Sequence, residues 1–169
     1  HQVTLNHKPI SPGTIFSRTG GLQLKDRSDQ RKAYRMQELT RWRDHLGAEL
    51  TLEPRFFPTN DQLAHGTVVA ARQSGDDPSE LVHALMRACW VEDQDIADPS
   101  VVSAALTTAG LDVDKLITLA KSEASRNEVD ANTEEAISRG VFGVPAYLIG
   151  DQLFWGQDRL KFVERALAL

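Results

Sequence analysis

The chain has 169 residues, of which 41% are hydrophobic, enough for one domain of ordinary size with a packed core. Its 24 acidic and 19 basic residues are mixed along the sequence and give a net charge of -5, so neither nucleic acid nor an anionic membrane is expected as a partner. Cys89 is the single cysteine, which excludes an intrachain disulfide and a cysteine-based metal site. The histidines show no ligand-like clustering, so no metal is expected either. No apolar run reaches the roughly 20 residues of a membrane helix, and we expect a reducing, cytoplasmic location.

The first part of the chain is predicted to contain a strand, a long loop and a helix. The alternation in "VTL" near the N-terminus predicts the strand. The stretch "SPGTIFSRTGGLQLKDRSDQ" is rich in Ser, Gly, Asp and Pro, which predicts a loop of a length that is often functional. From Gln30 to Leu46, apolar residues recur at helical spacing and Gly47 follows as a stop, so this segment is predicted to be a helix.

The middle of the chain is predicted to be helical. After the extended, proline-bounded "LTLEPRFFPTND", Asn60 or Asp61 can cap a helix that runs to about Ser74. Pro78 suits the first turn of the next helix. Two more helices are predicted at about 99–109 and 112–123, and a fifth helical run, "DANTEEAISRG", ends with Gly140 as its cap.

The last part of the chain is predicted to form a hairpin and a helix. The run "VPAYLI" reads as a buried strand, Gly150-Asp151 as its turn, and Leu153-Phe154-Trp155 as the returning strand. A helix is predicted at about 157–168. Pro145 is unusual at the head of a strand because proline has no amide hydrogen to give to the ladder.

Strands at both ends with helices between them predict an α/β domain interrupted by a helical insertion. We expect residues 1–27 and 126–169 to form a sheet domain with three short strands. Residues 28–125 would form the inserted all-helical domain.

Five segments in this order resemble the 2-hydroxychromene-2-carboxylate isomerases: "TGGLQLKDRS", "AYRMQELTRWRDHLG", "RFFP", "ACWVEDQDIAD" and "GVFGVPAYLIGDQLFWGQDRL". Those enzymes are similar to kappa-class glutathione transferases and belong to the DsbA-like branch of the thioredoxin superfamily. The resemblance implies a thioredoxin-like sheet with a helical insertion and a cis peptide bond before Pro145.

The resemblance also implies a glutathione site near the C-terminus. The backbone of Val144, next to Pro145, would pair with the cysteinyl part of glutathione like an added strand. The free amides of the following helix start would suit the γ-glutamyl carboxylate, and Asp158 its ammonium group. The implied contacts at that helix start are Trp155, Gly156, Gln157, Asp158 and Arg159. The alternative is an ordinary helix start with Asp158 in its first turn.

A second set of residues is predicted to bind the substrate. Lys25 and Arg27, with Asp26 between them, could hold a carboxylate, or they could be a solvated charge cluster. Phe57 and Trp90 could form aromatic walls, or they could belong to the core. Relatives often carry an asparagine near the position of Gly21, and its absence here leaves the exact substrate open.

The resemblance implies that a serine at the start of the family's first helix holds the glutathione thiolate. Ser11 and Ser17 are expected in the loop after the family's second strand, so no catalytic residue is assigned within this chain. We expect the serine and the first βα unit to precede His1, and hence the chain to be incomplete.

The function that the resemblance implies is glutathione-dependent isomerisation of 2-hydroxychromene-2-carboxylate or a related aromatic or conjugated acid, by reversible thiolate addition in a homodimer. Two alternatives stay open. One is a DsbA-like thiol-disulfide oxidoreductase, and the other is a glutathione-binding module without catalytic activity.

Overall fold

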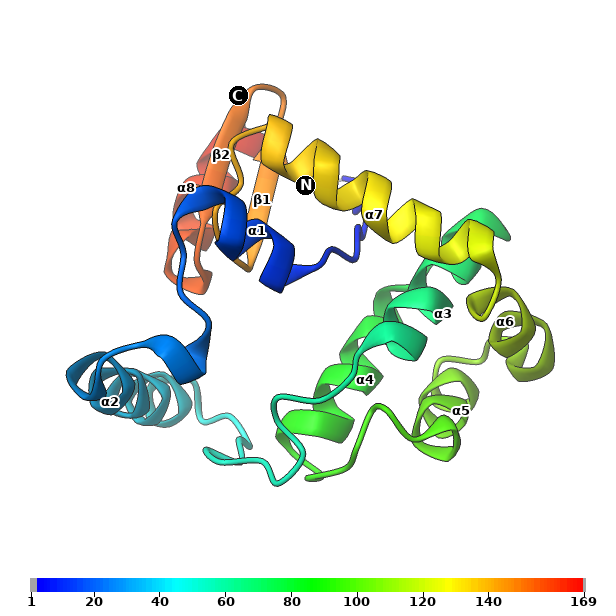
Figure 1. Ribbon diagram of the computed structural model, residues 1–169, viewed down its shortest axis with the longest axis horizontal. Coiled ribbons are helices and arrows are strands. Elements are labelled where there is room, and N and C mark those ends of the chain that lie inside the picture. Colours follow the sequence, from blue (N-terminus) through cyan, green and yellow to red (C-terminus); the bar gives the residue numbers. More distant parts are fainter. Residues whose placement is uncertain (1–2, 169) are drawn as a thin grey trace. The chain divides into compact units, whose positions relative to one another are not determined.

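The computed structural model describes residues 3–168 and divides the chain into two compact units. The first unit combines residues 1–26 with residues 130–169, and the second contains residues 27–129. Figure 1 shows the helices and the β1–β2 hairpin (residues 146–155) along the chain.

The first unit contains the sheet. Strands β1 (Ala146–Ile149) and β2 (Gln152–Trp155) form an antiparallel pair in which Ala146 lies opposite Trp155 and Ile149 opposite Gln152. Gly150, with a φ of 55°, begins the connecting turn. The predicted hairpin is therefore confirmed. After β2 come the 3-10 turn η2 (Gln157–Arg159) and helix α8 (Leu160–Leu167).

The predicted N-terminal strand is wrong, and the sheet has two strands among the described residues and not three. Residues 3–11 have no regular secondary structure. Val3 and Leu5 are 48% and 64% exposed. A strand needs a neighbour to receive its backbone hydrogen bonds, and alternation of residue types alone supplies none.

The predicted loop of residues 11–30 also needs correction, because it contains helix α1 (Pro12–Thr19) and the 3-10 turn η1 (Leu24–Asp26). The Ser11 hydroxyl caps α1 by accepting from the Thr14 amide, Pro12 stands in the first turn, and Gly20 ends the helix with a φ of 80°. These are ordinary helix start and stop signals. The Ser, Pro and Gly that suggested a loop are thus the caps of a short helix.

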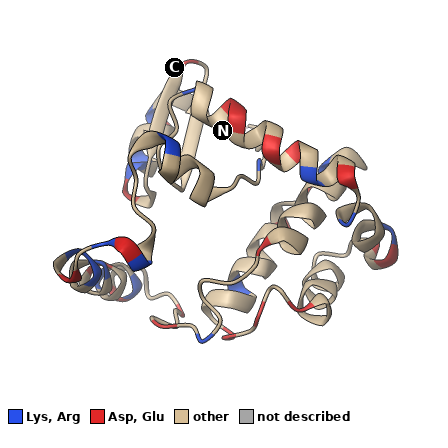
Figure 2. Cartoon of the chain, in the orientation of Figure 1, with Lys and Arg blue, Asp and Glu red and all other residues tan. Residues whose placement is uncertain are grey.

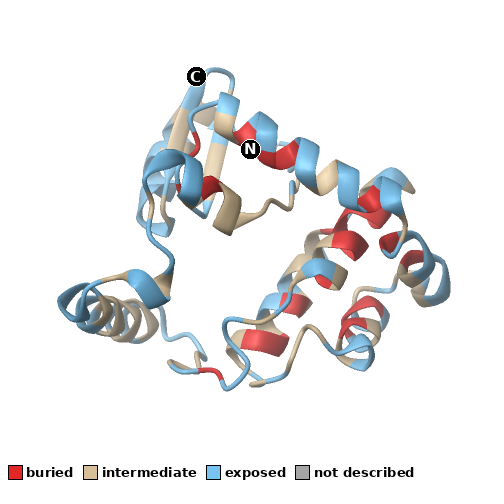
Figure 3. Cartoon of the chain, viewed as in Figure 1, coloured by how far each residue is buried: buried red, intermediate tan, exposed pale blue. Residues whose placement is uncertain are grey.

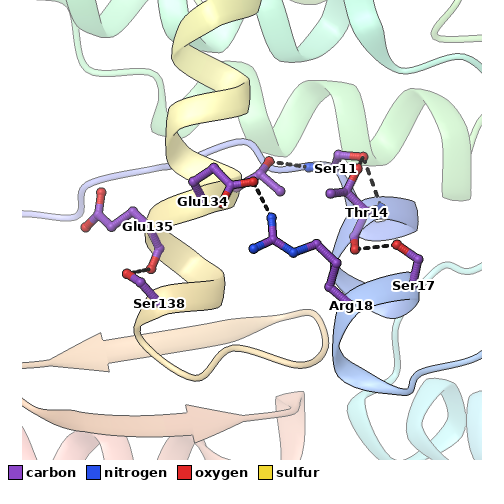
Figure 4. Close-up of polar contacts among 8 residues, drawn as sticks. Ser11, Thr14, Ser17, Arg18, Glu134, Glu135 and Ser138 are labelled. Carbon is purple, nitrogen blue, oxygen red and sulfur yellow. Dashed lines mark hydrogen bonds and ion pairs between the residues drawn. The ribbon is translucent and has the colours of Figure 1, made fainter.

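Helix α7 (Glu123–Ser138) anchors the N-terminal segment of the first unit. The Ser11 amide donates to the Thr133 hydroxyl at 2.9 Å, the Asn132 side chain donates to the Pro9 carbonyl at 3.3 Å, and Arg18 pairs with Glu134. Figure 4 shows Ser11, Thr14, Arg18 and Glu134 at this junction. Ile15 of α1, Ala136 of α7 and Val141 form a small buried core in the same unit.

Every regular element of the second unit is a helix. These are α2 (Asp29–Leu46), α3 (Gln62–Gln73), α4 (Ser79–Trp90), α5 (Pro99–Thr108), α6 (Val113–Ala120) and the first residues of α7. The helix predicted to begin near residue 130 begins instead at Glu123, and the one predicted at 112–123 ends at Ala120. The Ser122 hydroxyl accepts from the Ser125 amide at 3.2 Å, which caps the new start.

The core of the second unit lies between α3, α4, α5 and α6, where Figure 3 shows most of its buried residues. Gly66 permits the close approach of α3 and α6, because a Cβ there would lie 2.6 Å from the Ala120 carbonyl oxygen. Figure 2 shows both signs of charge on α2 and on α7. None of the helices in residues 3–168 is both long enough and apolar enough to cross a membrane.

Candidate functional site

The Val144–Pro145 peptide bond is cis, as predicted, and lies at the entrance to β1. The Pro145 carbonyl accepts from the Gly156 amide at 3.0 Å, which extends the hairpin by one pairing. The backbone amide and carbonyl of Val144 form no hydrogen bond with any part of the chain that the structure describes. Val144 is 44% exposed. An extended peptide can therefore pair with this residue.

Trp155 lies beside this position at the end of β2 and is 51% exposed. Its ring contacts that of Phe142, with centroids 4.9 Å apart. A Cβ on Gly143 would lie 2.5 Å from the indole Nε1, so glycine is required where the chain passes this ring. The residues just before Val144 thus position the Trp155 side chain.

Gly156 directs the chain from β2 into η2. Its φ of 101° and ψ of 151° are rarely adopted by other residues, and a Cβ would lie 2.7 Å from Oδ1 of Asp158. The Asp158 carboxylate pairs with the Arg159 guanidinium, and both side chains are over two-fifths exposed. An exposed pair of this kind contributes little to stability and exchanges easily for another partner.

The helix predicted from residue 157 begins as a 3-10 turn, and α8 starts only at Leu160. The Arg159 amide donates to the Gly156 carbonyl at 3.2 Å, which closes a three-residue turn. No side chain caps η2 or α8. The amides of Gln157 and Asp158 have no backbone acceptor within residues 3–168. Asp158 lies in this first turn without capping it, so the carboxylate does not serve as a helix cap.

Lys25 and Asp26 lie in η1 of the first unit, and both are exposed. Lys25 forms no ion pair with the described residues. Ser11 and Ser17 were expected in a loop. Ser11 instead caps the N-terminus of α1, and Ser17 lies within that helix. Their hydroxyls contact Thr14: Ser11 through the hydroxyl at 3.0 Å, and Ser17 by donating to the carbonyl at 2.9 Å.

Phe57 and Trp90 contact each other in the second unit. Their ring centroids are 4.6 Å apart, and Phe57 is 39% exposed. A third residue, Arg35 of α2, places its guanidinium carbon 5.9 Å from the Phe57 centroid. Arg27 lies close enough to Arg35 to lower its pKa, although burial is the larger cause. No local signal marks Arg35, because its contact with Phe57 depends on how distant segments pack.

Cys89 precedes Trp90 in α4 and is buried. Burial raises the pKa of its thiol, and the carboxylates of Asp93 and Asp95 raise it further. A thiol in this environment stays protonated at neutral pH and is a poor nucleophile. Within residues 3–168 no group of three or more His, Cys, Asp or Glu side chains could hold a metal ion.

Comparison with known proteins relates this geometry to a family. The sequence model described as a DSBA-like thioredoxin domain matches residues 1–168. The chain is 32% identical to the 2-hydroxychromene-2-carboxylate isomerase of Pseudomonas putida, over 98% of this chain and 80% of that protein.

The isomerase of Sphingobium xenophagum is 32% identical over 78% of this chain, and that of Pseudomonas sp. (strain C18) is 31% identical over 77%. These matches span 66% and 59% of the two relatives. A solved structure of selenomethionine 2-hydroxychromene-2-carboxylate isomerase superimposes with a TM-score of 0.76 at 27% identity. The superimposed region covers 98% of this chain and 80% of the chain of that isomerase structure.

Proposed function

The chain belongs to the 2-hydroxychromene-2-carboxylate isomerase family of DsbA-like thioredoxin proteins, and we propose that it is a glutathione-dependent isomerase of 2-hydroxychromene-2-carboxylate or a related aromatic or conjugated acid. The observation that carries the proposal is the Val144 backbone, which has no hydrogen-bond partner among the described residues and lies beside Pro145 and the Gly156–Arg159 turn. A redox enzyme has no need of a γ-glutamyl site, so the turn favours an isomerase over a thiol-disulfide oxidoreductase.

Glutathione would bind in the first unit through its backbone and its γ-glutamyl end. Its cysteinyl amide and carbonyl would pair with Val144 as an added strand. The γ-glutamyl carboxylate would accept from the amides of Gln157 and Asp158, and the ammonium group would meet the Asp158 carboxylate. Trp155 would cover the apolar part of the ligand, and Arg159 would lose its present pairing with Asp158.

The acid substrate would be recognised by cations and aromatic rings. Lys25 and Arg27 would hold its carboxylate, with Asp26 limiting the positive charge between them, and Phe57 and Trp90 would offer a flat apolar wall. The wall is supported by the direct contact between the two rings, since a pair of packed rings presents one continuous surface.

The chemistry is a reversible conjugate addition. Opening of the hemiketal ring of 2-hydroxychromene-2-carboxylate gives a phenol and an α-keto acid whose carbonyl group is conjugated with the double bond. The glutathione thiolate would form a C–S bond at the carbon β to that carbonyl, and the electron pair would move onto the carbonyl oxygen as an enolate. The former double bond, now single, would rotate, after which the enolate would expel the thiolate. Glutathione is regenerated, and cations near the enolate oxygen would stabilise its developing charge.

The test follows the absorbance of 2-hydroxychromene-2-carboxylate with the chain present, with and without glutathione. We expect conversion only with glutathione, and none with S-methylglutathione, which lacks the thiol. If neither this acid nor a panel of related acids reacts, the isomerase proposal is wrong. Calorimetry and insulin reduction then separate the alternatives: glutathione binding without turnover indicates an inactive module, and insulin reduction indicates an oxidoreductase.

We also propose, from the family membership, that the protein is a homodimer located in the cytoplasm. Light scattering tests the first part, with an expected mass of about twice the 18.7 kDa of one chain. A mass equal to that of one chain would contradict it.

A further inference from the structure

Arg35 occupies an unusual position in the second unit. Its guanidinium lies over the ring of Phe57, which in turn packs against Trp90. The side chain of Arg35 is half-buried, and among residues 3–168 its one polar contact is from Nη1 to the Met36 sulfur at 3.8 Å. A thioether is a weak acceptor, so this contact does little to satisfy a guanidinium.

The charge of Arg35 has no counterion in the part of the chain that the structure describes. It forms no ion pair with a carboxylate anywhere in residues 3–168. Its charged neighbour is a second cation, Arg27, and burial and Arg27 together lower the pKa of Arg35. A half-buried cation beside another cation is unfavourable unless an anion neutralises it.

Other arginines of the same unit are different. Several form ion pairs with carboxylates, namely Arg41, Arg43, Arg55, Arg72 and Arg87. Arg31, on the same helix as Arg35, is exposed and solvated. Arg35 therefore combines partial burial with the lack of a carboxylate partner.

The aromatic surface next to Arg35 is held in place by its own contacts. The Arg55 amide and Nε donate to the Asp93 carboxylate at 2.7 and 2.5 Å, and the Thr59 hydroxyl donates to Asp95 at 2.5 Å. These bonds fix both ends of the segment that carries Phe57. On the other side of the ring pair, the Trp90 carbonyl accepts from the Thr51 amide at 2.7 Å.

We propose that Arg35 is a specificity-determining residue that holds, together with its neighbour Arg27, the carboxylate of a flat aromatic acid lying against Phe57 and Trp90. The planar guanidinium can bind a carboxylate with two parallel hydrogen bonds while it remains stacked on the ring. The aromatic pair selects a flat ligand, and the carboxylate supplies the missing counterion. This inference rests on the proposed function, because the acid that Arg35 would bind is the substrate of the proposed isomerase.

The Phe57–Trp90 ring pair favours aromatic carboxylic acids over other anions. Glutathione has carboxylates but no aromatic group, so it would leave the Phe57–Trp90 surface unused. A polyanion such as nucleic acid is disfavoured by the net charge of -5. A single carboxylate on an aromatic ring satisfies both features.

Calorimetric titration of the 169-residue chain with 2-naphthoate and with neutral 2-naphthamide, without glutathione, tests the proposal. We expect Arg35→Gln to weaken 2-naphthoate binding about tenfold or more, as for loss of a charge-assisted bidentate pair, and to change 2-naphthamide binding less than about twofold. Arg35→Lys should lie between Arg35→Gln and the parent, because it keeps the charge and loses the planar fork.

Arg31→Gln is the matched control, since it removes the same charge from an exposed position of α2 and should leave both affinities unchanged. Circular dichroism and thermal melting check that each variant is folded. The proposal is overturned if Arg35→Gln weakens both probes equally, if it binds 2-naphthoate as tightly as the parent, or if the parent binds neither probe.

Turnover measurements separate this inference from the proposed function. Arg35-dependent naphthoate binding in a chain without glutathione-dependent turnover would refute the isomerase function and support the acid site. Normal turnover with an unchanged KM in Arg35→Gln would refute the acid site and leave the isomerase function standing.

Discussion

In the first unit the candidate glutathione site is one continuous segment, Phe142–Arg159, whereas in the second unit Arg35, Phe57 and Trp90 come from three separate segments. The first site relies on backbone groups of Val144 and the η2 turn, arranged by two glycines that allow close approaches. The second relies on side chains that three separate segments bring into contact. The first is therefore expected to be sensitive to backbone conformation, and the second to charge and ring shape.

The largest effect should come from Gly156→Ala, which acts on the backbone. Gly156 has a φ of 101°, and an added Cβ would meet the Asp158 carboxylate. Forcing another residue into such a conformation costs on the order of 1–3 kcal/mol. We expect the turn to rearrange and glutathione affinity, measured by calorimetry, to fall about a hundredfold.

Gly150→Ala is the control for that change. Gly150 also has a positive φ, in the hairpin turn, with nothing near its added Cβ. This variant should lose thermal stability while its glutathione affinity stays near that of the parent. Equal loss of affinity in both variants would mean that the hairpin as a whole, and not the Gly156 turn, controls binding.

Asp158→Ala should have the next largest effect, because one charge-assisted hydrogen bond to the glutathione ammonium contributes about 1.5–3 kcal/mol. This corresponds to a loss of glutathione affinity of about tenfold to hundredfold by calorimetry. Asp151→Ala, in the exposed hairpin turn, is the control and should change nothing. Undiminished glutathione binding by Asp158→Ala would remove Asp158 from the site.

Lys25→Ala and Arg27→Ala should show the opposite pattern to Asp158→Ala. Each should lower kcat/KM for the acid substrate and leave glutathione affinity nearly unchanged, since these cations would act on the substrate carboxylate. Steady-state kinetics and calorimetry on the same preparations measure both quantities. Loss of glutathione affinity in Lys25→Ala equal to that in Asp158→Ala would contradict the division of roles.

Phe57→Leu should have a smaller effect, confined to the acid. An aromatic pair contributes about 0.5–1.5 kcal/mol beyond its buried area, so 2-naphthoate affinity should fall about threefold to tenfold. Phe56→Leu is a close control, since Phe56 is also 39% exposed and lies under Arg55, away from the Trp90 contact. Equal effects of the two substitutions would mean that the ring pair is not the binding surface.

The smallest effect concerns His65 of α3 and the pH dependence of stability. Burial lowers the pKa of His65 below its usual 6.5, and the nearby Asp61 carboxylate partly offsets this. Protonation therefore favours the unfolded state, so the contribution of neutral His65 is present above pH 6.5 and declines as the pH falls. In urea unfolding at pH 7 and pH 5, His65→Gln should lose less stability on acidification than the parent, whereas exposed His83→Gln should behave like the parent.

Part of the fold followed from the sequence because its signals are local. Gly150-Asp151 between two apolar runs predicted the hairpin, and apolar spacing with Gly47 predicted α2, because turn and cap preferences act over a few neighbouring residues. The same local rules apply to residues 11–20, where Ser11 and Gly20 cap α1 and Pro12 stands in its first turn, although the composition of this stretch is typical of a loop. The resemblance to a family placed the cis bond at Pro145 correctly.

Other features were decided only by the tertiary structure. The alternation at Val3 and Leu5 predicted a strand, but a strand exists only where another strand receives its hydrogen bonds, and that depends on the fold. The position of Arg35 over Phe57 could not be inferred from spacing, because it arises from packing between segments that are distant in the chain. Periodicity and caps determine which residues are helical. The contact between the Arg35 guanidinium and the Phe57 ring, by contrast, exists only because the tertiary structure brings α2 and the irregular segment around Phe57 together.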